Sequence, residues 1–311
     1  MILAMKHSSG SRSRASELSV QQLQTFRCVY ERGGYAAAAR EMELSVPTVW
    51  QHIQTLQRLY RTDLFEKSGR GVVATAMAAK LYTQVTELLA GLDSTFDLAA
   101  DEQGDSRPIT IVAGVRMMME EIANPLQQFR QAWDNPLVLR EGNNQVAEEL
   151  ILSGEADLAL TLEPEHEKAS PLIHFEPAYL VEFLAICKKG HPFAGSSNCT
   201  LRELVKHDLV VTRPGTHGRD ALDHTLHRER LTANVVAETD NSGFTIACVR
   251  AGLGVGVLAG RVNGELCRRL VVKSLRRHLG ERQIAFMWKK GRRLSPAVQS
   301  LVDTIKQSNV G

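Results

Sequence analysis

Residues 35–54, YAAAAREMELSVPTVWQHIQ, constrain the fold of this chain more than any other stretch, because they predict two short helices joined by a tight turn. The alanines at positions 36–39 favour the first helix and are small enough for a second helix to pack closely across them. Ser45 stands where its hydroxyl can cap the second helix, and Pro47 falls in the first turn, where a missing N–H carries no penalty.

The second helix of this pair is predicted to have one inward and one free face. Apolar residues recur at spacings of four, three and four, which places them on one buried side: Val49, Ile53, Leu56 and Tyr60. The opposite side is polar and carries Thr48, Gln51, Gln54, Thr55 and Arg58. A helix-turn-helix whose second helix keeps a polar face free has the geometry that enters the DNA major groove.

Residues 18–81 resemble the amino-terminal domain of LysR-type transcriptional regulators. The likeness rests on motifs in one order: a Leu-x-x-Phe helix, Gly-Gly before an aromatic residue, the alanines, LSVP, Leu-Phe-Glu, and a threonine that starts a long helix. The resemblance implies a winged helix-turn-helix at 17–75 that binds double-stranded DNA, followed by a dimerisation helix at 76–104. Residues 1–16 are predicted to be a disordered arm.

Two short strands at 64–67 and 72–74 are predicted to form the wing around the turn 68–71, with Arg70 at its tip. Arg70 is expected to reach a phosphate or the adjacent minor groove, the alternative being a solvated turn. Gln51 can pair bidentately with adenine. The candidate DNA-binding residues are Ser45, Val46, Pro47, Thr48, Trp50, Gln51, His52, Thr55, Arg58, Arg70 and Thr75.

Three reading positions depart from the family pattern. The family usually has arginine where this chain has Gln51, glutamine in place of Val46, and a small polar residue in place of Trp50. Val46 could contact a thymine methyl group, and Trp50 either faces DNA or packs half-buried. The operator sequence of the family therefore does not carry over to this chain.

The helix predicted from residue 76 onward carries a long apolar stripe. That stripe either packs on its own domain or meets a partner helix, and the resemblance implies pairing in a homodimer. Two paired helix-turn-helix units also reach two half-sites, which raises the binding free energy. The resemblance further implies a homotetramer formed through effector-domain contacts. The stripe consists of Met77, Leu81, Val85, Leu88, Leu92, Phe96 and Ala99.

Charge and cysteine content narrow the class of protein. The formal net charge is +2, yet residues 1–75 hold ten Lys/Arg and six Asp/Glu, which suits contacts with phosphates. The five cysteines are widely spaced and include no Cys-x-x-Cys, so neither a disulfide framework nor a zinc site is predicted. No apolar run reaches the roughly 18 residues of a membrane span, so a cytoplasmic location without membrane contact is expected.

After a polar linker at 101–108, strands and helices alternate, which predicts an α/β domain with a parallel sheet. EGNNQVAEELILSGEADLAL, KKGHPFA, RPGTHGRDALDHTL and VRAGLGVGVLAG resemble the family's effector domain. The resemblance implies two lobes like those of a type 2 periplasmic binding protein, with crossover strands near 179–183 and 281–285. The domain is predicted at 105–311, with lobe I at 105–180 and 283–311 and lobe II at 181–282.

Four junctions between strands and helices are expected to converge on a cleft between the lobes. Helix amino termini present free N–H groups there, so a small, anionic effector is predicted. Arg116 or Arg219 could neutralise its charge. No cofactor is expected. The candidate effector-binding residues are Gly114, Arg116, Asn143, Asn144, Thr161, Thr212, Thr216, His217, Arg219 and Asn241.

Three rival interpretations differ in the class of protein or site. Asp220 and His224 lie one helical turn apart and could share a metal, although such pairs are more often a solvated face. The chain contains no G-x-S-x-G, P-loop or Cys/His signature, so an enzyme is not predicted. The strongest competitor is a constitutive or architectural DNA-binding protein whose cleft is vestigial.

Overall fold

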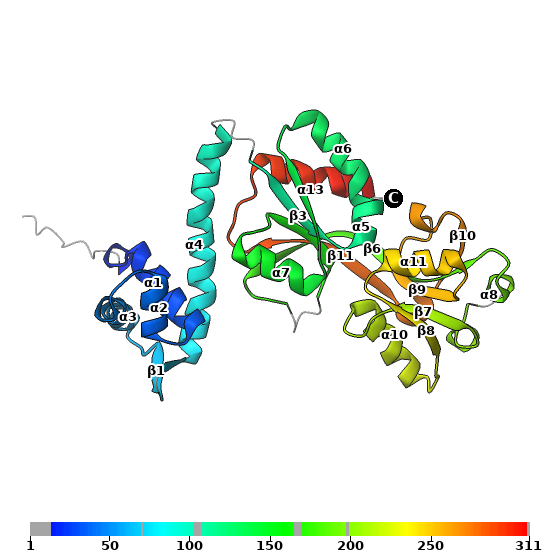
Figure 1. The fold of residues 1–311 in the computed structure, drawn as a ribbon. Coiled ribbons are helices and arrows are strands. Elements are labelled where there is room, and N and C mark those ends of the chain that lie inside the picture. The colour runs from blue at the N-terminus through cyan, green and yellow to red at the C-terminus, as the bar shows by residue number, and fades with distance from the viewer. Residues whose placement is uncertain (1–13, 70, 103–106, 165–168, 197–198, 310–311) are drawn as a thin grey trace, which may run out of the picture. The chain divides into compact units, whose positions relative to one another are not determined.

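The computed structural model describes residues 14–69, 71–102, 107–164, 169–196 and 199–309. The chain divides into two compact units (Figure 1). The first comprises residues 1–96 with 290–293, and the second comprises residues 97–289 with 294–311.

The first unit is a helical domain with a two-stranded hairpin. Arg14–Glu17, which include the end of the predicted disordered arm, form a short 3-10 helix. Residues 1–13 of that arm lie outside the described residues. The elements are η1 (Arg14–Glu17), α1 (Val20–Arg32), α2 (Tyr35–Glu41), α3 (Val46–Tyr60), β1 (Phe65–Ser68), β2 (Gly71–Ala74) and α4 (Ala76–Glu102).

Capping and packing fix the position of α3. Ser45 accepts a hydrogen bond from the backbone N–H of Thr48 at 3.2 Å, which starts the helix, and Arg61 ends it in the left-handed region. Three inward residues of α3 and the last two alanines of α2 are buried in one core, while Tyr60 is partly buried against it. That core consists mainly of Phe26, Val29, Ala38, Ala39, Val49, Ile53 and Leu56.

Hydrogen bonds to its backbone hold the hairpin against the helices. The Gln57 side-chain oxygen accepts from the backbone N–H groups of Leu64 and Phe65 at 2.9 and 3.3 Å. The N–H of Val72 donates to the carbonyl of Gly33 at 3.1 Å. A Cβ at Gly71 would lie 2.8 Å from the same carbonyl oxygen, so glycine permits this close approach. The wing is therefore positioned by α3 and by the turn between α1 and α2.

The apolar stripe of α4 separates into two rows. Leu81, Val85 and Leu89 are buried against the core of the first unit. Leu88 and Phe96 are 62% and 71% exposed, and Leu92 is 36% exposed. Part of the predicted stripe thus packs on its own domain, while a second row remains uncovered in the single chain.

The second unit is built on a nine-stranded sheet of order β4-β3-β5-β11-β6-β9-β7-β8, with β10 paired to β6. Its strands are β3 (Ile109–Ala113), β4 (Leu137–Glu141), β5 (Leu158–Leu162), β6 (Ile173–Lys188), β7 (Asp208–Thr212), β8 (Asn234–Thr239), β9 (Val255–Gly260), β10 (Leu270–Ser274) and β11 (Glu281–Lys289).

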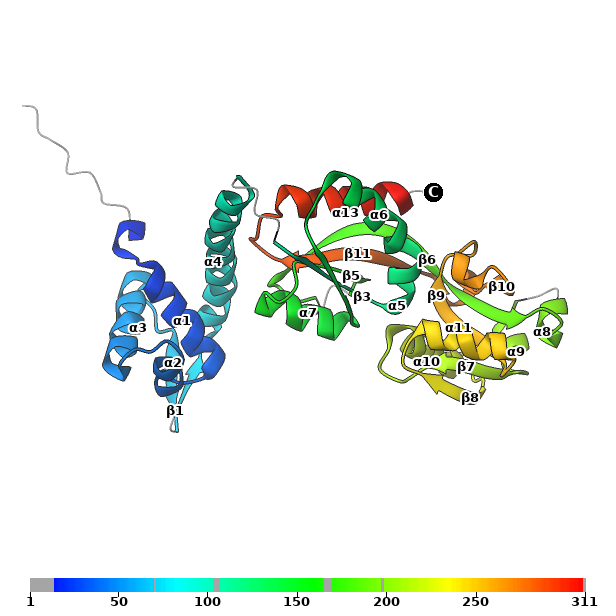
Figure 2. The same cartoon turned by 45° about the horizontal axis from the view of Figure 1, so that its top comes forward.

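Helices flank this sheet, and α6 and α13 lie side by side over one part of it (Figures 1 and 2). The helical elements are α5 (Val115–Met117), the π-helical η2 (Met118–Ile122), α6 (Ala123–Ala132), α7 (Asn144–Ser153), α8 (Pro192–Gly195), α9 (Leu201–Leu204), α10 (His217–Arg228), α11 (Ser242–Ala251), η4 (Glu265–Cys267), α12 (Arg276–Leu279) and α13 (Pro296–Asn309).

Two long antiparallel strands, β6 and β11, run through both halves of the sheet (Figure 2). β11 also pairs with β5 and β6 with β9, so each half has its own strands and its own core. β6 begins at buried Ile173, which pairs with Lys289 of β11. No helix in the described part of the chain is long and apolar enough to cross a membrane.

Candidate functional site

The outward face of α3 is open to solvent. Trp50, Gln51 and Arg58 are exposed on it, as are Val46 and Pro47 in its first turn. Thr48 and Thr55 are partly exposed. No residue in the described part of the first unit covers this face, which leaves it free to meet another molecule.

Two predicted DNA-binding residues, His52 and Thr75, form hydrogen bonds within the first unit. The Nδ1 atom of His52 lies 2.9 Å from the hydroxyl of buried Thr25, which holds the ring against α1. Thr75 donates to the carbonyl of Asp63 at 3.0 Å and accepts from the N–H of Ala78 at 3.1 Å, so its hydroxyl caps α4. Arg70 lies outside the described residues.

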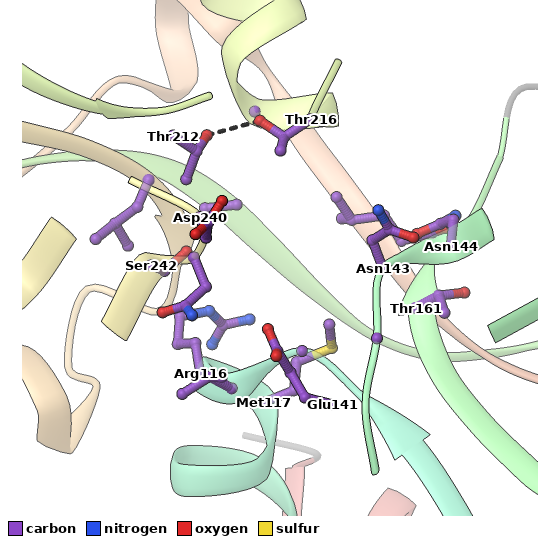
Figure 3. Close-up of a pocket in the computed structure, with 18 of the residues that line it drawn as sticks. Arg116, Met117, Glu141, Asn143, Asn144, Thr161, Thr212, Thr216, Asp240 and Ser242 are labelled. Atoms are coloured by element: carbon purple, nitrogen blue, oxygen red, sulfur yellow. Dashed lines mark hydrogen bonds between the residues drawn. The ribbon is translucent and has the colours of Figure 1, made fainter. Parts of the chain in front are cut away.

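The second unit encloses a cavity of about 330 Å³. It lies at the ends of strands from both halves of the sheet, where Figure 3 shows polar side chains directed toward a common space. The residues that line it are Gly114–Met117, Glu141–Gln145, Thr161, Leu162, Thr212, Gly215, Thr216, Gly218, Asp240–Ser242, Leu258, Ala259 and Ile284.

Three helices meet the cavity with capped amino termini. The side chains of Asn143, Thr216 and Asn241 accept hydrogen bonds from the third N–H group of α7, α10 and α11, at 3.0, 3.4 and 3.1 Å. The earlier N–H groups of each helix have no acceptor within their own helix. Those groups and the helix dipoles favour an anionic or hydrogen-bond-accepting group in the cavity.

Thr161 is a buried residue of the lining with an unpartnered hydroxyl. Its side chain is 1% exposed, and its hydroxyl has no hydrogen-bond partner within the described structure. A buried hydroxyl that lacks a partner costs free energy, so such groups usually serve a bound molecule or water. Thr161 lines the cavity from β5.

Arg116 lines the cavity but its guanidinium is already paired. It lies 3.1 Å from the carboxylate of Glu120 and also contacts Glu121, and all three side chains are buried. Burial alone lowers the pKa of Arg116, but the two carboxylates outweigh it and raise that pKa. Burial likewise raises the pKa of Glu121, although Arg116 opposes that shift.

Arg219 is not part of the lining. Its guanidinium lies 2.8 Å from Asp223 and 2.6 Å from Glu238, and it donates to the Thr212 carbonyl at 3.3 Å. The arginine thus anchors the start of α10 to β7 and β8. Burial lowers the pKa of Arg219, but hydrogen bonds to Glu238 and Asp223 outweigh it, so the pKa is raised.

The remaining predicted residues fall into three groups. Thr212 and Thr216 share a hydroxyl hydrogen bond of 2.7 Å at the cavity (Figure 3), and Asn144 donates to the Leu162 carbonyl at 2.6 Å. Gly114, Asn143 and Asn241 also line the cavity. His217 begins α10, and its side chain lies outside the described features.

The predicted effector-binding residues did not include two acidic residues of the lining, although Asp240 lies in one of the four junctions expected at the cleft. Glu141 is the last residue of β4, and Asp240 directly follows β8. Both positions flank asparagines that were predicted, so the ends of the strands were the available signal. Asp240 lies 3.5 Å from exposed Arg213. The cavity therefore carries negative side chains as well as helix amino termini.

The described residues contain no group of three metal-binding side chains close enough to hold an ion. Asp220 instead accepts a hydrogen bond from the N–H of Gly215 at 3.0 Å, which stabilises the turn before α10.

Two family models match the chain in order. The one described as bacterial regulatory helix-turn-helix protein, lysR family, matches residues 20–79. The one described as LysR substrate binding domain matches residues 102–309. Together they cover the first unit through the start of α4 and nearly all of the second.

Relatives agree with this assignment. The HTH-type transcriptional activator CmpR of Synechocystis sp. is 25% identical over 242 residues, covering 78% of this chain and 79% of that protein. The regulator CysB of Haemophilus influenzae is 25% identical over 241 residues, covering 76% of this chain and 73% of that protein.

A solved structure gives the same fold. Full-length CbnR in complex with target DNA has a TM-score of 0.53 and 17% identity, covering 94% of this chain and 100% of that one. At that identity the likeness shows the fold alone. With both units matched in order, this chain belongs to the LysR family of DNA-binding transcriptional regulators, which is not a family of enzymes, and carries the family's effector-binding domain.

Proposed function

We propose that this protein binds operator DNA as a homodimer in the cytoplasm, and that a small molecule in the cavity of the second unit modulates that binding. The exposed face of α3 supplies the DNA contact, and the uncovered row of α4 supplies the subunit contact. Assembly of dimers into a homotetramer, which the family resemblance implies, belongs to the same proposal.

The observation that carries the effector proposal is the unpartnered hydroxyl of Thr161 in a cavity of about 330 Å³. A vestigial cleft would be expected to fill with apolar side chains, because an unsatisfied buried hydroxyl is destabilising. This cavity instead retains polar groups from β5, α7, α10 and α11. A ligand-responsive regulator is therefore favoured over a constitutive DNA-binding protein.

The charge of the effector follows from the same geometry. Both arginines predicted to neutralise an anion are held by carboxylates, Arg116 by Glu120 and Glu121 and Arg219 by Asp223 and Glu238. We therefore propose that helix amino termini, rather than a free arginine, bind the anionic group of the effector. Glu141 and Asp240 favour a ligand that also carries a hydrogen-bond donor or a positive group.

Thr161→Val tests the cavity. Small acids and amino acids are first screened for those that raise the unfolding midpoint of the wild-type protein, because a ligand that binds the folded state stabilises it. Thr161→Val keeps the side-chain volume and removes one hydroxyl. The free variant should be at least as stable as wild type, because the lost hydroxyl has no partner. It should bind the strongest hit about tenfold more weakly, measured by calorimetry.

The matched control is Thr225→Val, which changes a buried threonine outside the cavity. It should bind the hit as tightly as wild type does. Equal affinity of wild type and Thr161→Val would remove Thr161 from the site. A screen without any hit would favour the constitutive DNA-binding protein instead.

Gln51→Ala tests the DNA interface. Gln51 is exposed on α3, so its loss should leave the unfolding midpoint unchanged. Loss of a bidentate base contact should weaken binding to a selected operator by about 5- to 150-fold. The measurement is a titration followed by fluorescence anisotropy, with exposed Gln127→Ala in α6 as the control. An unchanged operator affinity would refute the role of Gln51.

A further inference from the structure

Two apolar side chains project from the reading helix. Val46 is 45% exposed and Trp50 is 52% exposed, and they lie four residues apart on α3. Residues at that spacing differ by only about 40° around a helix, so the two side chains form one surface. Gln51 lies about 100° further round, on the adjacent polar face.

The fold does not account for this surface. The buried side of α3 is completed by Val49, Ile53 and Leu56, each without exposed area. Within the described part of the chain, the side chain of Trp50 makes no ring contact and no hydrogen bond. A half-exposed tryptophan that supports neither core nor cap is typical of a contact surface, because aromatic side chains gain most from burial against a partner.

The position of Val46 and Trp50 on α3 indicates which group this surface contacts. Val46 is the first residue of α3 and Trp50 lies in its second turn, which is the part of a reading helix that contacts base edges. The one apolar group on those edges in the major groove is the C5 methyl of thymine. We propose that Val46 and Trp50 form a methyl-reading surface that selects thymine at positions beside the base read by Gln51.

This inference rests on the proposed operator binding and specifies a chemical group of the DNA that the protein recognises. It implies that part of the specificity comes from apolar contact, where the family commonly uses polar side chains. A contact of Trp50 with the sugar-phosphate backbone is the main alternative, because the indole N–H can donate to a phosphate. That contact would weaken binding to every sequence alike.

The experiment starts from duplexes that the wild-type protein selects from a random-sequence pool. Each thymine of the consensus is then replaced singly by deoxyuridine, which lacks the methyl group and keeps every hydrogen-bonding atom. At one or two positions per half-site, deoxyuridine should weaken wild-type binding by about fourfold per methyl group. The other thymines should tolerate the change.

Variants then identify the protein side of the contact in a double-mutant cycle. Trp50→Ala should bind the thymine duplex more weakly and should no longer distinguish thymine from deoxyuridine at the sensitive position. Val46→Ala should lose discrimination at a neighbouring thymine. Trp50→Phe keeps an aromatic surface without the indole N–H and should retain the deoxyuridine penalty. Val262→Ala, an exposed valine of the second unit, is the matched control.

The outcomes separate the two proposals. Selection of no consensus by the wild-type protein would overturn operator binding itself. A consensus without any deoxyuridine-sensitive thymine would overturn methyl reading alone. The same would follow if Trp50→Ala weakened thymine and deoxyuridine duplexes equally and kept their ratio. Unchanged unfolding midpoints of the variants, expected because both residues are exposed, exclude misfolding as the cause.

Discussion

Arg116→Met should destabilise the second unit by about 3–5 kcal/mol, because it leaves buried carboxylates without their counter-charge. Arg116, Glu120 and Glu121 are each at most 7% exposed at their side chains. Equilibrium unfolding in urea measures the loss. Exposed Arg140, which pairs with Glu155 at 3.3 Å, is the control, and Arg140→Met should cost at most about 1 kcal/mol.

Glu120, one of these buried carboxylates, also connects the two halves of the sheet. Glu120 in η2 accepts a hydrogen bond from the N–H of Leu266 in η4 at 2.9 Å. The carbonyl of Glu121 accepts from the side chain of Asn309 in α13 at 3.1 Å. Arg116 touches both this network and the cavity.

The destabilisation should depend on pH in a defined direction. Burial raises the pKa of Glu121 above its ordinary 4.5, so this group favours folding below that value and opposes it as pH rises. Without Arg116, ionised Glu121 has lost this counter-charge and opposes folding more strongly. The difference in unfolding free energy between wild type and Arg116→Met should therefore widen as pH rises above about 4.5.

A second substitution, Glu121→Gln in the Arg116→Met background, separates charge from packing. It removes the carboxylate that becomes unpaired and should restore part of the lost stability, with a flatter pH dependence. A loss below about 1 kcal/mol in Arg116→Met, or no recovery in the double variant, would contradict the charge account.

Leu92→Glu combined with Phe96→Glu should convert the proposed homodimer to a monomer. Both residues belong to the uncovered row of α4, and Leu88 extends that row by one turn. Burying an apolar side chain of this size contributes about 1.5–3 kcal/mol, and a symmetric dimer buries each residue twice. The dimer dissociation constant should rise by at least about a thousandfold.

Sedimentation equilibrium measures that change, and Asp93→Lys, a charge change at an exposed neighbouring position, is the control. The monomeric variant should also lose most operator affinity, because a single helix-turn-helix reaches one half-site only. A double variant that remains dimeric would show that α4 does not join the subunits.

The first unit was predictable because its determinants are local. Ser45, Pro47 and the apolar spacing of α3 lie within one short stretch, and each acts on neighbouring backbone. It was harder to predict what each residue of the α4 stripe contacts, since periodicity marks Val85 and Phe96 as apolar without telling which partner each one meets. The structure buries the first and exposes the second.

The position of the cavity could be predicted from the sequence, but the charge pairing of its lining residues was not. Strand ends and helix caps indicated Asn143, Thr216 and Asn241, all of which line it. Arg116 pairs with Glu120 and Glu121, which follow it by four and five residues, so this pairing lay within the local sequence and the sequence interpretation overlooked it. The contact between Glu120 and Leu266 spans 146 residues, and no local pattern encodes it. β10 was also missed, because it forms only by pairing with β6.

The central claim, that the open face of α3 reads DNA, is tested most directly by selection of random duplexes with wild type and with Gln51→Ala/Arg58→Ala in parallel. Both side chains are exposed, so the variant should fold normally. Wild type should enrich one consensus with two half-sites on the same face of the duplex, and the variant should enrich none. The same consensus from both proteins, or none from wild type, would contradict the claim.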